Sequence, residues 1–197
     1  MTTLKAEKRS MDVKAKRLRR EGYVTGNVFG KKIQGSIPVK MEKKDVDRLL
    51  KTETKGGQIM LDVEGEVYDV LIKEVDYDDA MANQVVEIDF QALVSNEKVH
   101  SVAEIIFENH DKVEAGVLQE VLKEVSYRAL PAALVEKVKV DVGEMEIGDT
   151  IRVKDLSIAK DKDIDILTDL EAVVATVTAV HNNVPETDEE ADAEEAK

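Results

Sequence analysis

A recurrence of apolar side chains at every second position is the feature that most restricts the fold of this chain. It runs through QIMLDV (58–63), stops at Glu64–Gly65, and resumes in EVYDVLI (66–72). A period of two puts alternate side chains on one face of a β-strand. Two such runs joined by two turn-forming residues are typical of a β-hairpin. The sequence therefore predicts an antiparallel hairpin near the middle of the first half.

The segment VVEIDF (85–90) shows the same alternation. It places Val86, Ile88 and Phe90 on one face and Glu87 and Asp89 on the other. GSIPVK (35–40) also looks extended, whereas MEKKDVDRLLKTE (41–53) spaces its apolar residues for one short amphipathic helix. Together these elements predict a small β-barrel or curved sheet with one or two helices, ending near Ala92.

A second strand-rich block follows. Its strand-like segments are VHSVAEIIFE (99–108), LVEKVKVDV (134–142) and DIDILTDLEAVVATVTAV (163–180). GVLQEVLKEVSYRAL (116–130) is ambiguous, because Val117, Val121 and Val125 also fit helical spacing. Helices and strands do not alternate in the way that builds a parallel sheet. We therefore predict a mainly β protein with a C-terminal antiparallel β-rich domain, divided into residues 1–92, 93–183 and an acidic tail at 184–197.

Charge is distributed unevenly along the chain. The net charge is −14, yet residues 1–50 hold 14 Lys and Arg against 6 Asp and Glu, a balance of +8, which leaves −22 for the remainder. The tail VPETDEEADAEEAK (184–197) has almost no bulky apolar residues, so we expect it to be disordered. A solubility tail and a decoy that discourages non-specific RNA binding are both consistent with it. The basic part is suited to a polyanion, which the acidic part would repel.

Composition also bears on location. There is no cysteine, which removes disulfides, thiolate metal sites and a cysteine nucleophile. The start MTTLKAEKRS has no signal-peptide-like apolar stretch, and no apolar run approaches the ~20 residues of a membrane span. We expect a soluble cytoplasmic protein with no membrane partner.

The basic segment KAKRLRR (14–20) is the main candidate binding element. Met11, Ala15 and Leu18 form a narrow apolar stripe at helical spacing, and Gly22 is placed to end a short helix in a left-handed conformation. Cations surround the stripe: Lys5, Lys8, Arg9, Lys14, Lys16, Arg17, Arg19 and Arg20. A solvated helix face is the simple explanation. Because Asp12 is the only acid between Arg9 and Arg20, a phosphate backbone is a strong alternative partner.

Two aromatic residues follow in GYVTGNVFG (22–30). Tyr23 and Phe29 are suited to stacking on bases or sugars, or to filling the core of an aromatic-poor domain. Glu87 and Asp89, if exposed, would repel phosphate but accept hydrogen bonds from base amino groups or a 2′-hydroxyl. A plain solvent-exposed strand face explains them equally well.

Catalytic and metal sites are not indicated. DKDIDILTD (161–169) begins like a calcium loop, but the sixth position is Ile166 where glycine is needed, and the twelfth is Ala172 where glutamate is needed. His100, His110 and His181 lack metal-ligand spacing, and no glycine-rich phosphate loop or nucleophile motif is present. We expect no cofactor, no metal and no enzymatic activity. A buried His–carboxylate pair in a cleft would revive the enzyme hypothesis.

The segments as a set resemble one family. LKAEKR, KRLRREGYVTGNVFG, VVEIDF and VLQEVLKEVSYRALPAALVEKVKVDVGEMEIGDTIRVKDL occur in the order found in the long form of bacterial large-subunit ribosomal protein number twenty-five, the general stress protein Ctc family. The resemblance implies an N-terminal β-barrel that binds 5S ribosomal RNA on the large subunit. It also implies contact with neighbouring ribosomal proteins and a C-terminal β domain of less settled role. We expect a monomer in the free state.

The resemblance also implies site residues. The RNA contacts carried over are Arg9, Lys14, Lys16, Arg17 and Arg19, with Arg20 beside them, together with Phe29, Lys73 and Asp89. Phe29 stands where the family usually has tyrosine before glycine, Lys73 lies on a strand that normally faces the RNA, and Asp89 is the acid of the H-x-D-F motif.

Three positions depart from the family. Glu87 replaces the usual histidine, Thr25 replaces the usual proline, and DYDDAM (76–81) adds Asp78 and Asp79 near the expected RNA face. These changes predict binding that is weaker, salt-sensitive or directed at a variant RNA. The alternative function is a stress-induced interaction module, in which the acidic C-terminal domain docks on a protein.

Overall fold

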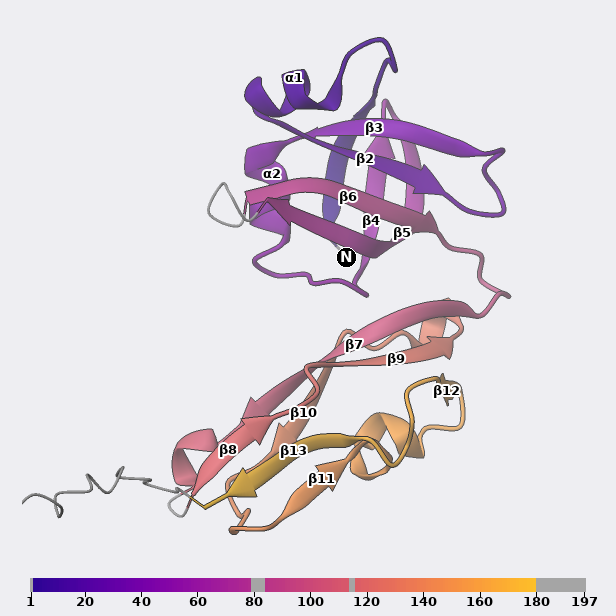
Figure 1. The fold of residues 1–197 in the computed structure, drawn as a ribbon. Helices are drawn as coiled ribbons and strands as arrows, with labels where there is room; N and C mark the ends of the chain where they lie inside the picture. Colours follow the sequence, from indigo (N-terminus) through magenta and orange to yellow (C-terminus); the bar gives the residue numbers. More distant parts are fainter. Residues whose placement is uncertain (1, 79–83, 114–115, 180–197) are drawn as a thin grey trace, which may run out of the picture.

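The computed structural model describes residues 2–78, 84–113 and 116–179, and it shows a barrel followed by a second, elongated β-rich half (Figure 1). No helix in those residues is long and apolar enough to cross a membrane. The elements of the first half are β1 (Thr3–Lys8), α1 (Ala15–Arg20), β2 (Tyr23–Phe29), β3 (Ser36–Glu42), α2 (Lys43–Leu49), β4 (Gln58–Val63), β5 (Glu66–Asp78) and β6 (Gln84–Ala92).

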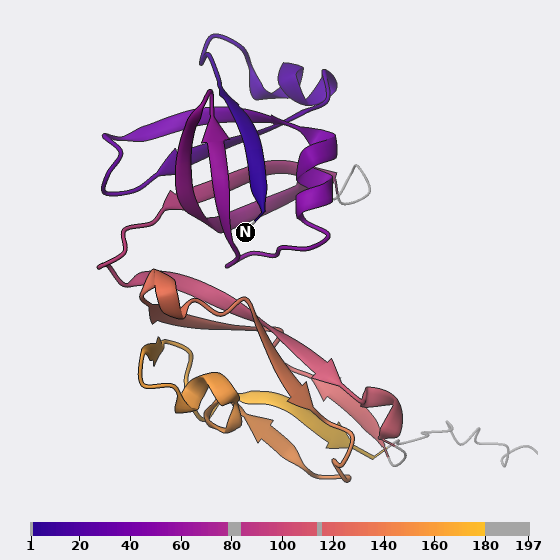
Figure 2. The same ribbon diagram turned by 180° about the vertical axis from the view of Figure 1, so that it is seen from behind.

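The first half is a closed barrel with strand order β1-β3-β2-β6-β5-β4, which confirms the predicted N-terminal barrel. Two of its pairs, β1 with β4 and β2 with β6, are parallel, and the others are antiparallel. Alternate residues of each strand fill the barrel, and α2 adds Val46 and Leu49 to the same core, beside the strands in the rear view (Figure 2). Apolar burial of this kind is the main force holding the strands closed.

The predicted hairpin is present as β4 and β5. Glu64 and Gly65 connect the strands with φ angles of 56° and 95°. Positive φ at both central residues is the geometry of the two-residue turns that match the right-handed twist of a hairpin. Register pairs Val63 with Glu66 directly across the turn, so the alternation read from the sequence falls on the correct faces.

The face predicted for β6 is correct in part. Ile88 and Phe90 are fully buried, but Val85 takes the third core position and Val86 is only half-buried. The register of β6 against β5 shifts between Asp76 and Tyr77, so one residue of β6 is left out of the ladder. Such a bulge moves every residue beyond it to the opposite face.

The short predicted helices also form, with one difference. α1 ends before Gly22, whose φ of 90° agrees with the predicted left-handed termination. Leu18 is buried, but Met11 lies before the helix and is 73% exposed, so it does not belong to the apolar stripe. The helix is held to the barrel mainly through Leu18.

The second half is also mainly β, as predicted. Its elements are β7 (Val99–Glu108), η2 (His110–Lys112), β8 (Val117–Glu120), β9 (Glu124–Ala129), η3 (Pro131–Ala133), β10 (Lys137–Asp141), β11 (Thr150–Arg152), η4 (Val153–Asp155), η5 (Ser157–Lys160), β12 (Ile164–Ile166) and β13 (Val173–Thr178). The ambiguous segment 116–130 is two strands, β8 and β9. The predicted division at residues 92 and 93 stays a prediction, and the acidic tail at 184–197 lies outside the described residues.

Two sheets of order β10-β7-β9-β12 and β11-β13-β8 enclose the second core. Most pairs are antiparallel, as predicted, but β10 runs parallel to β7. β9 runs antiparallel to β7 and ends beside its start, with Ala129 opposite Val99. The segment through η3 then crosses to the other edge of β7, where β10 runs parallel to it.

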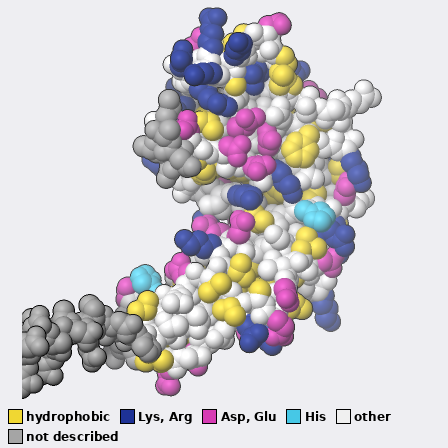
Figure 3. Space-filling view, in the orientation of Figure 1, with side chains coloured by type: hydrophobic (Ala, Val, Ile, Leu, Met, Phe, Trp, Pro, Cys, Tyr) yellow, Lys and Arg dark blue, Asp and Glu magenta, His cyan; other side chains and the backbone are white. Residues whose placement is uncertain are grey.

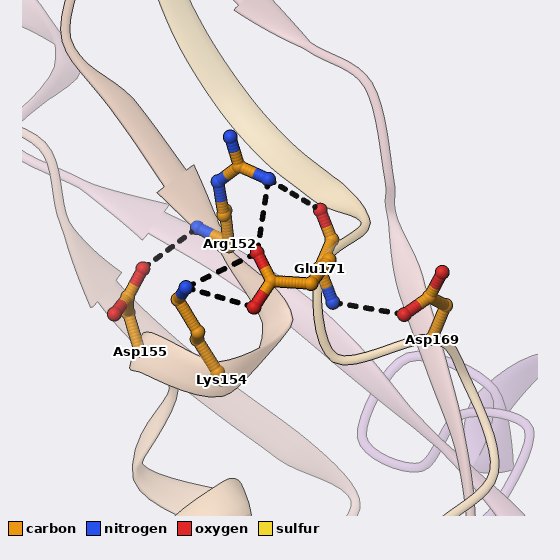
Figure 4. A network of polar contacts seen from close by, with 5 residues as sticks. All are labelled: Arg152, Lys154, Asp155, Asp169 and Glu171. Carbon is orange, nitrogen blue, oxygen red and sulfur yellow. Dashed lines mark hydrogen bonds and ion pairs between the residues drawn. The ribbon is translucent and has the colours of Figure 1, made fainter.

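Polar contacts close the end of this half. Arg152 and Lys154 both bind the carboxylate of Glu171, at 3.1 Å and 2.9 Å, and Arg152 Nη1 also donates to the Glu171 carbonyl oxygen at 3.0 Å (Figure 4). Asp155 and Asp169 accept backbone N–H groups of Arg152 and Glu171, each at 3.0 Å. The network ties the β11–η4 segment to the loop before β13.

The two halves meet along a packed junction. Leu71 of the barrel is fully buried against Leu93 and Val99, with Leu134 beside them. The loop at Gly56 approaches β7 so closely that a Cβ there would overlap the Val102 carbonyl oxygen. The junction is therefore built from both backbone and side chains.

Candidate nucleic-acid interface

The cationic cluster lies on and around α1, at the end of the barrel farthest from the second half (Figures 1 and 3). Lys14, Lys16 and Arg20 are exposed and form no ion pair with any described residue. Unpaired cations gathered on one short helix attract a polyanion more strongly than the same charges dispersed and neutralised. These three side chains are available to an external anion.

Two further arginines of α1 have intramolecular partners. Arg17 Nε lies 2.9 Å from Glu21 Oε1, one helical turn away, and Arg19 Nη2 lies 3.7 Å from Glu87 Oε2 on β6. Exposed pairs of this kind contribute only about 0–1 kcal/mol, so a phosphate can displace the carboxylate. α1 is thus cationic but not wholly separated from the acidic residues of its own chain.

Arg9 follows β1 and lies half-buried beside the helix. Its Nη2 donates to the Val13 carbonyl oxygen at 3.2 Å, and its Nε is buried without a hydrogen-bond partner. A buried donor left unpaired carries a desolvation cost. Arg9 therefore has both a fixed position and an unused hydrogen-bond donor.

An acidic band, defined here as Glu74, Asp76, Glu87 and Asp89, crosses the outer face of β5 and β6. Register places Asp76 opposite Glu87 and Glu74 opposite Asp89. Magenta side chains lie on this barrel face next to the blue cluster over α1 (Figure 3). Of these four acids, only Glu87 and Asp89 were singled out from the sequence. Glu74 and Asp76 were visible in the alternation of β5, but their pairing with β6 was not.

Glu87 has a pKa raised above its usual range. Burial is the main cause, the neighbouring carboxylates of Asp89 and Asp76 add to it, and the Arg19 and Arg9 guanidiniums oppose it. Its side chain is 34% exposed, so its charge faces water on one side. The resemblance led us to expect histidine at this position, and the glutamate makes the face beside α1 less cationic.

Asp89 is fixed between β6 and β2. Its Oδ1 accepts the backbone N–H of Asn27 at 3.0 Å and the Asn27 side-chain amide at 3.2 Å. One carboxylate oxygen is thereby used in holding two parallel strands together. The other oxygen, Oδ2, has no hydrogen-bond partner among the described residues.

The glycine-rich strand β2 has a steric explanation. A Cβ at Gly26 would overlap the Ile88 carbonyl oxygen, because β2 and β6 lie very close at this point. Thr25 beside it is fully buried and donates to the Val86 carbonyl oxygen at 3.3 Å. Thr25, which replaces the family's usual proline, therefore serves the packing of these strands.

The two aromatic residues of β2 lie outside the barrel core and are half-buried. Lys40 Nζ lies 4.6 Å from the centre of the Tyr23 ring and 2.7 Å from Glu7 Oε2, so Tyr23 already has a cationic partner. Phe29 ends the strand, opposite Gln91 and Ser36. Of the two rings, Phe29 is the more available for stacking.

Lys73 is not grouped with the α1 cations. Its Nζ donates to the His100 carbonyl oxygen at 2.8 Å, across the junction with the second half. The register of β5 shifts between Ile72 and Glu74, which leaves Lys73 out of the ladder.

Asp78 ends β5 and Asp79 lies outside the described residues. In the described part of the chain, no three acidic or histidine side chains are grouped as metal ligands.

Comparison with known proteins agrees with this architecture. Residues 4–90 match the Ribosomal L25p family, and residues 98–181 match the family described as ribosomal protein TL5, C-terminal domain. Large ribosomal subunit protein bL25 of Bacillus pumilus is 31% identical, covering 99% of this chain and 94% of the relative. The protein of the same name from Caldanaerobacter subterraneus is 29% identical, covering 95% of this chain and 94% of the relative. That from Thermoanaerobacter sp. is also 29% identical, covering 84% of this chain and 82% of the relative.

The match covers both halves of the chain, in the order barrel then second β-rich half. The chain therefore belongs to the bL25 family of ribosomal proteins, in the long, Ctc-type form that carries a TL5-type C-terminal domain.

Proposed function

We propose that this protein is a non-enzymatic component of the large ribosomal subunit that binds 5S ribosomal RNA through its basic N-terminal barrel. The observation that supports this most directly is the group of exposed, unpaired cations on α1, Lys14, Lys16 and Arg20. The relatives are named as large ribosomal subunit proteins, which favours a place on the ribosome in the cytoplasm.

Binding takes place in two parts. The α1 cations neutralise phosphates and release their counterions, which provides most of the affinity and little sequence information. Arg9 after β1, Arg19 on α1 and Asp89 on β6 then contact base edges or 2′-hydroxyls. Phe29 stacks on a base or sugar at the end of β2.

Salt dependence tests the first part. If about five cations meet phosphate, the logarithm of the affinity falls with the logarithm of salt concentration at a slope of about −4. Replacing Lys14, Lys16 and Arg20 together by glutamine makes that slope shallower by about 3. The matched control replaces Lys123, Lys160 and Lys162, exposed lysines of the second half, and leaves the slope unchanged. A flat response in the wild type would refute the proposal.

Specificity tests the second part. Filter binding compares 5S RNA with an unrelated stem of the same length, and equal affinity for both would remove specific recognition. Arg19→Ala weakens binding of 5S RNA by about 1–3 kcal/mol if Arg19 reads a base edge, and by less, equally for both RNAs, if it meets phosphate. An unchanged affinity would remove Arg19 from the site.

Association with the subunit is tested by sedimentation of a cell lysate. The protein should migrate with the large subunit at low salt and be released at high salt. Recovery only at the top of the gradient would exclude the ribosomal role and leave the acidic second half as the functional part.

A further inference from the structure

A cleft of about 330 Å³ lies where the barrel meets the second half. Lys55, Gly56 and Lys73 line it from the barrel side, and His100 and Ser126 line it from the other side. Both halves of the molecule are therefore needed to form it. Dark-blue side chains lie at this junction on the same face as the α1 cluster, with the magenta acidic band between them (Figure 3).

Lys73 is unusual within the cleft. Its ammonium donates one hydrogen bond, to the His100 carbonyl oxygen at 2.8 Å, and it forms no ion pair with any described residue. An ammonium has three N–H donors, so the described residues leave the other two unused. Burial, and secondly the nearby charge of Lys55, lower the pKa of Lys73. A partly desolvated cation beside a second cation is stabilised by any anion that enters between them.

Lys55 is the second cation. Its side chain is 44% exposed, and its Nζ lies 3.9 Å from Glu124 Oε2, a loose pair that an anion with shorter contacts can replace. Glu74 also lines the cleft and opposes an incoming anion. The charge of Glu74 raises the pKa of Lys73, but this effect is smaller than the lowering caused by burial and by the charge of Lys55. Lys55 and Lys73 both line the cleft, so a compact anion that enters it can lie against both ammonium groups.

We propose that this cleft between the two halves binds a phosphate group, held by Lys73 and Lys55. Lysine binds phosphate as a point charge, and a cleft of about 330 Å³ has room for a phosphate with water around it. The phosphate belongs either to the backbone of the RNA that occupies α1 or to a free phosphate compound. The RNA source rests on the proposed function, whereas the free-phosphate source does not.

The first experiment is independent of RNA. Inorganic pyrophosphate is titrated into the full-length protein, and amide chemical shifts of Gly56, Lys73 and Val102 are followed by NMR. We expect saturable shifts that Lys55→Met weakens about tenfold, consistent with one charged hydrogen bond. Lys162→Met, at an exposed lysine of the second half, leaves them unchanged. Absence of saturable shifts at these amides in the wild type would overturn the proposal.

A variant that is expected to bind more tightly provides a test that a folding defect cannot imitate. Glu124→Gln releases Lys55 from its loose ion pair and should tighten pyrophosphate binding about two- to fivefold, the range expected for one exposed carboxylate partner. A loss of binding in this variant would contradict the assigned role of Lys55. Lys73→Met is the direct test of the second ligand, with spectra checked for intact amide dispersion in both halves.

The second experiment identifies the source. The salt slope of 5S RNA binding is measured for the wild type and for Lys55→Met, each as full-length protein. A slope shallower by about 1 in the variant assigns the cleft to the RNA backbone. An unchanged slope with pyrophosphate binding lost assigns it to a free phosphate compound. If RNA fails to bind at all but pyrophosphate occupies the cleft, the proposed function fails and this inference stands.

Discussion

Replacing Glu87 by glutamine should strengthen RNA binding. The Glu87 carboxylate lies 3.7 Å from an Arg19 guanidinium nitrogen and shares the acidic band with Asp76 and Asp89. In the free protein it competes with phosphate for Arg19, and in a complex it repels the backbone. Glutamine keeps the shape and hydrogen-bonding capacity of the side chain while removing both effects.

The size of the effect follows from the geometry. Two unit charges at this distance attract by about 1 kcal/mol in the dielectric of water. Since Arg19 and Glu87 are 36% and 34% exposed, side-chain entropy and salt reduce this to the 0–1 kcal/mol measured for surface pairs. The expected gain in affinity is therefore about two- to fivefold at low salt, smaller at high salt because screening weakens both effects.

Fluorescence anisotropy with labelled 5S RNA measures this gain. The matched control is Glu108→Gln, which removes a carboxylate from a 2.6 Å pair with Lys139 in the second half and changes the net charge equally. The control should leave the affinity unchanged. A gain of the same size in both variants would show that net charge alone matters, and a loss in Glu87→Gln would show that the carboxylate itself binds RNA.

The dependence on pH provides a second readout of the same prediction. The pKa of Glu87 is raised, so it takes up its proton at a higher pH than an ordinary glutamate. Its protonation favours the folded state at low pH, and that contribution is lost as the pH rises through the raised pKa. RNA affinity of the wild type should therefore approach that of Glu87→Gln as the pH falls through the raised pKa of Glu87. A constant ratio between the two proteins would contradict the assignment.

Two further predictions concern stability. Gly26→Ala should destabilise the barrel by about 3 kcal/mol, because the new methyl group overlaps the Ile88 carbonyl oxygen; an unchanged urea midpoint would refute this. Tyr127→Phe should lower the free energy of unfolding by about 2 kcal/mol, because the buried Tyr127 hydroxyl donates to the Val135 carbonyl oxygen and accepts the Val135 N–H, both at 2.8 Å. The control Tyr77→Phe, at a side chain that is 51% exposed, should change the thermal midpoint little.

Local features of the fold were predictable from the sequence. The β4–β5 hairpin needed only the alternation and Glu64–Gly65, and α1 ended where Gly22 allowed it. The segment 116–130 was not decided, because a spacing of four between Val117, Val121 and Val125 satisfies a strand as well as a helix. In the structure Val125 is buried and Val117 and Val121 are exposed, a distinction set by tertiary packing.

Features that depend on distant pairing were not predictable. The parallel contacts of β1 with β4 and β2 with β6 involve strands far apart in sequence, which no local period encodes. Because of the bulge in β6 beside Asp76, Val85 rather than Val86 lies in the core. Because of the shift in β5 beside Ile72, Lys73 points to the junction, where it binds the His100 carbonyl oxygen. A single extra residue in a ladder reverses the faces beyond it.

The same reasoning explains the candidate site. The cations of α1 were predictable because they are contiguous, so a count of charges finds them. The acidic band was not, because Arg19 and Glu87 are 68 residues apart and meet only through the packing of α1 beside β2 and β6. Local sequence thus identifies the attractive part of the interface, and the fold adds the repulsive part.

If α1 binds RNA as we propose, the two parts together favour discrimination between RNAs over raw affinity. A uniformly cationic face would bind any phosphate backbone, because that attraction carries little sequence information. With carboxylates beside α1, a backbone that runs straight across β6 meets Glu87 and Asp89 and is repelled. A backbone that bends away, and presents base amino groups or 2′-hydroxyls there, gains hydrogen bonds instead. Specificity then arises as a difference between attraction for one RNA shape and repulsion of the others. The acids that lower the total affinity are in this view the residues that make the shape of the RNA matter.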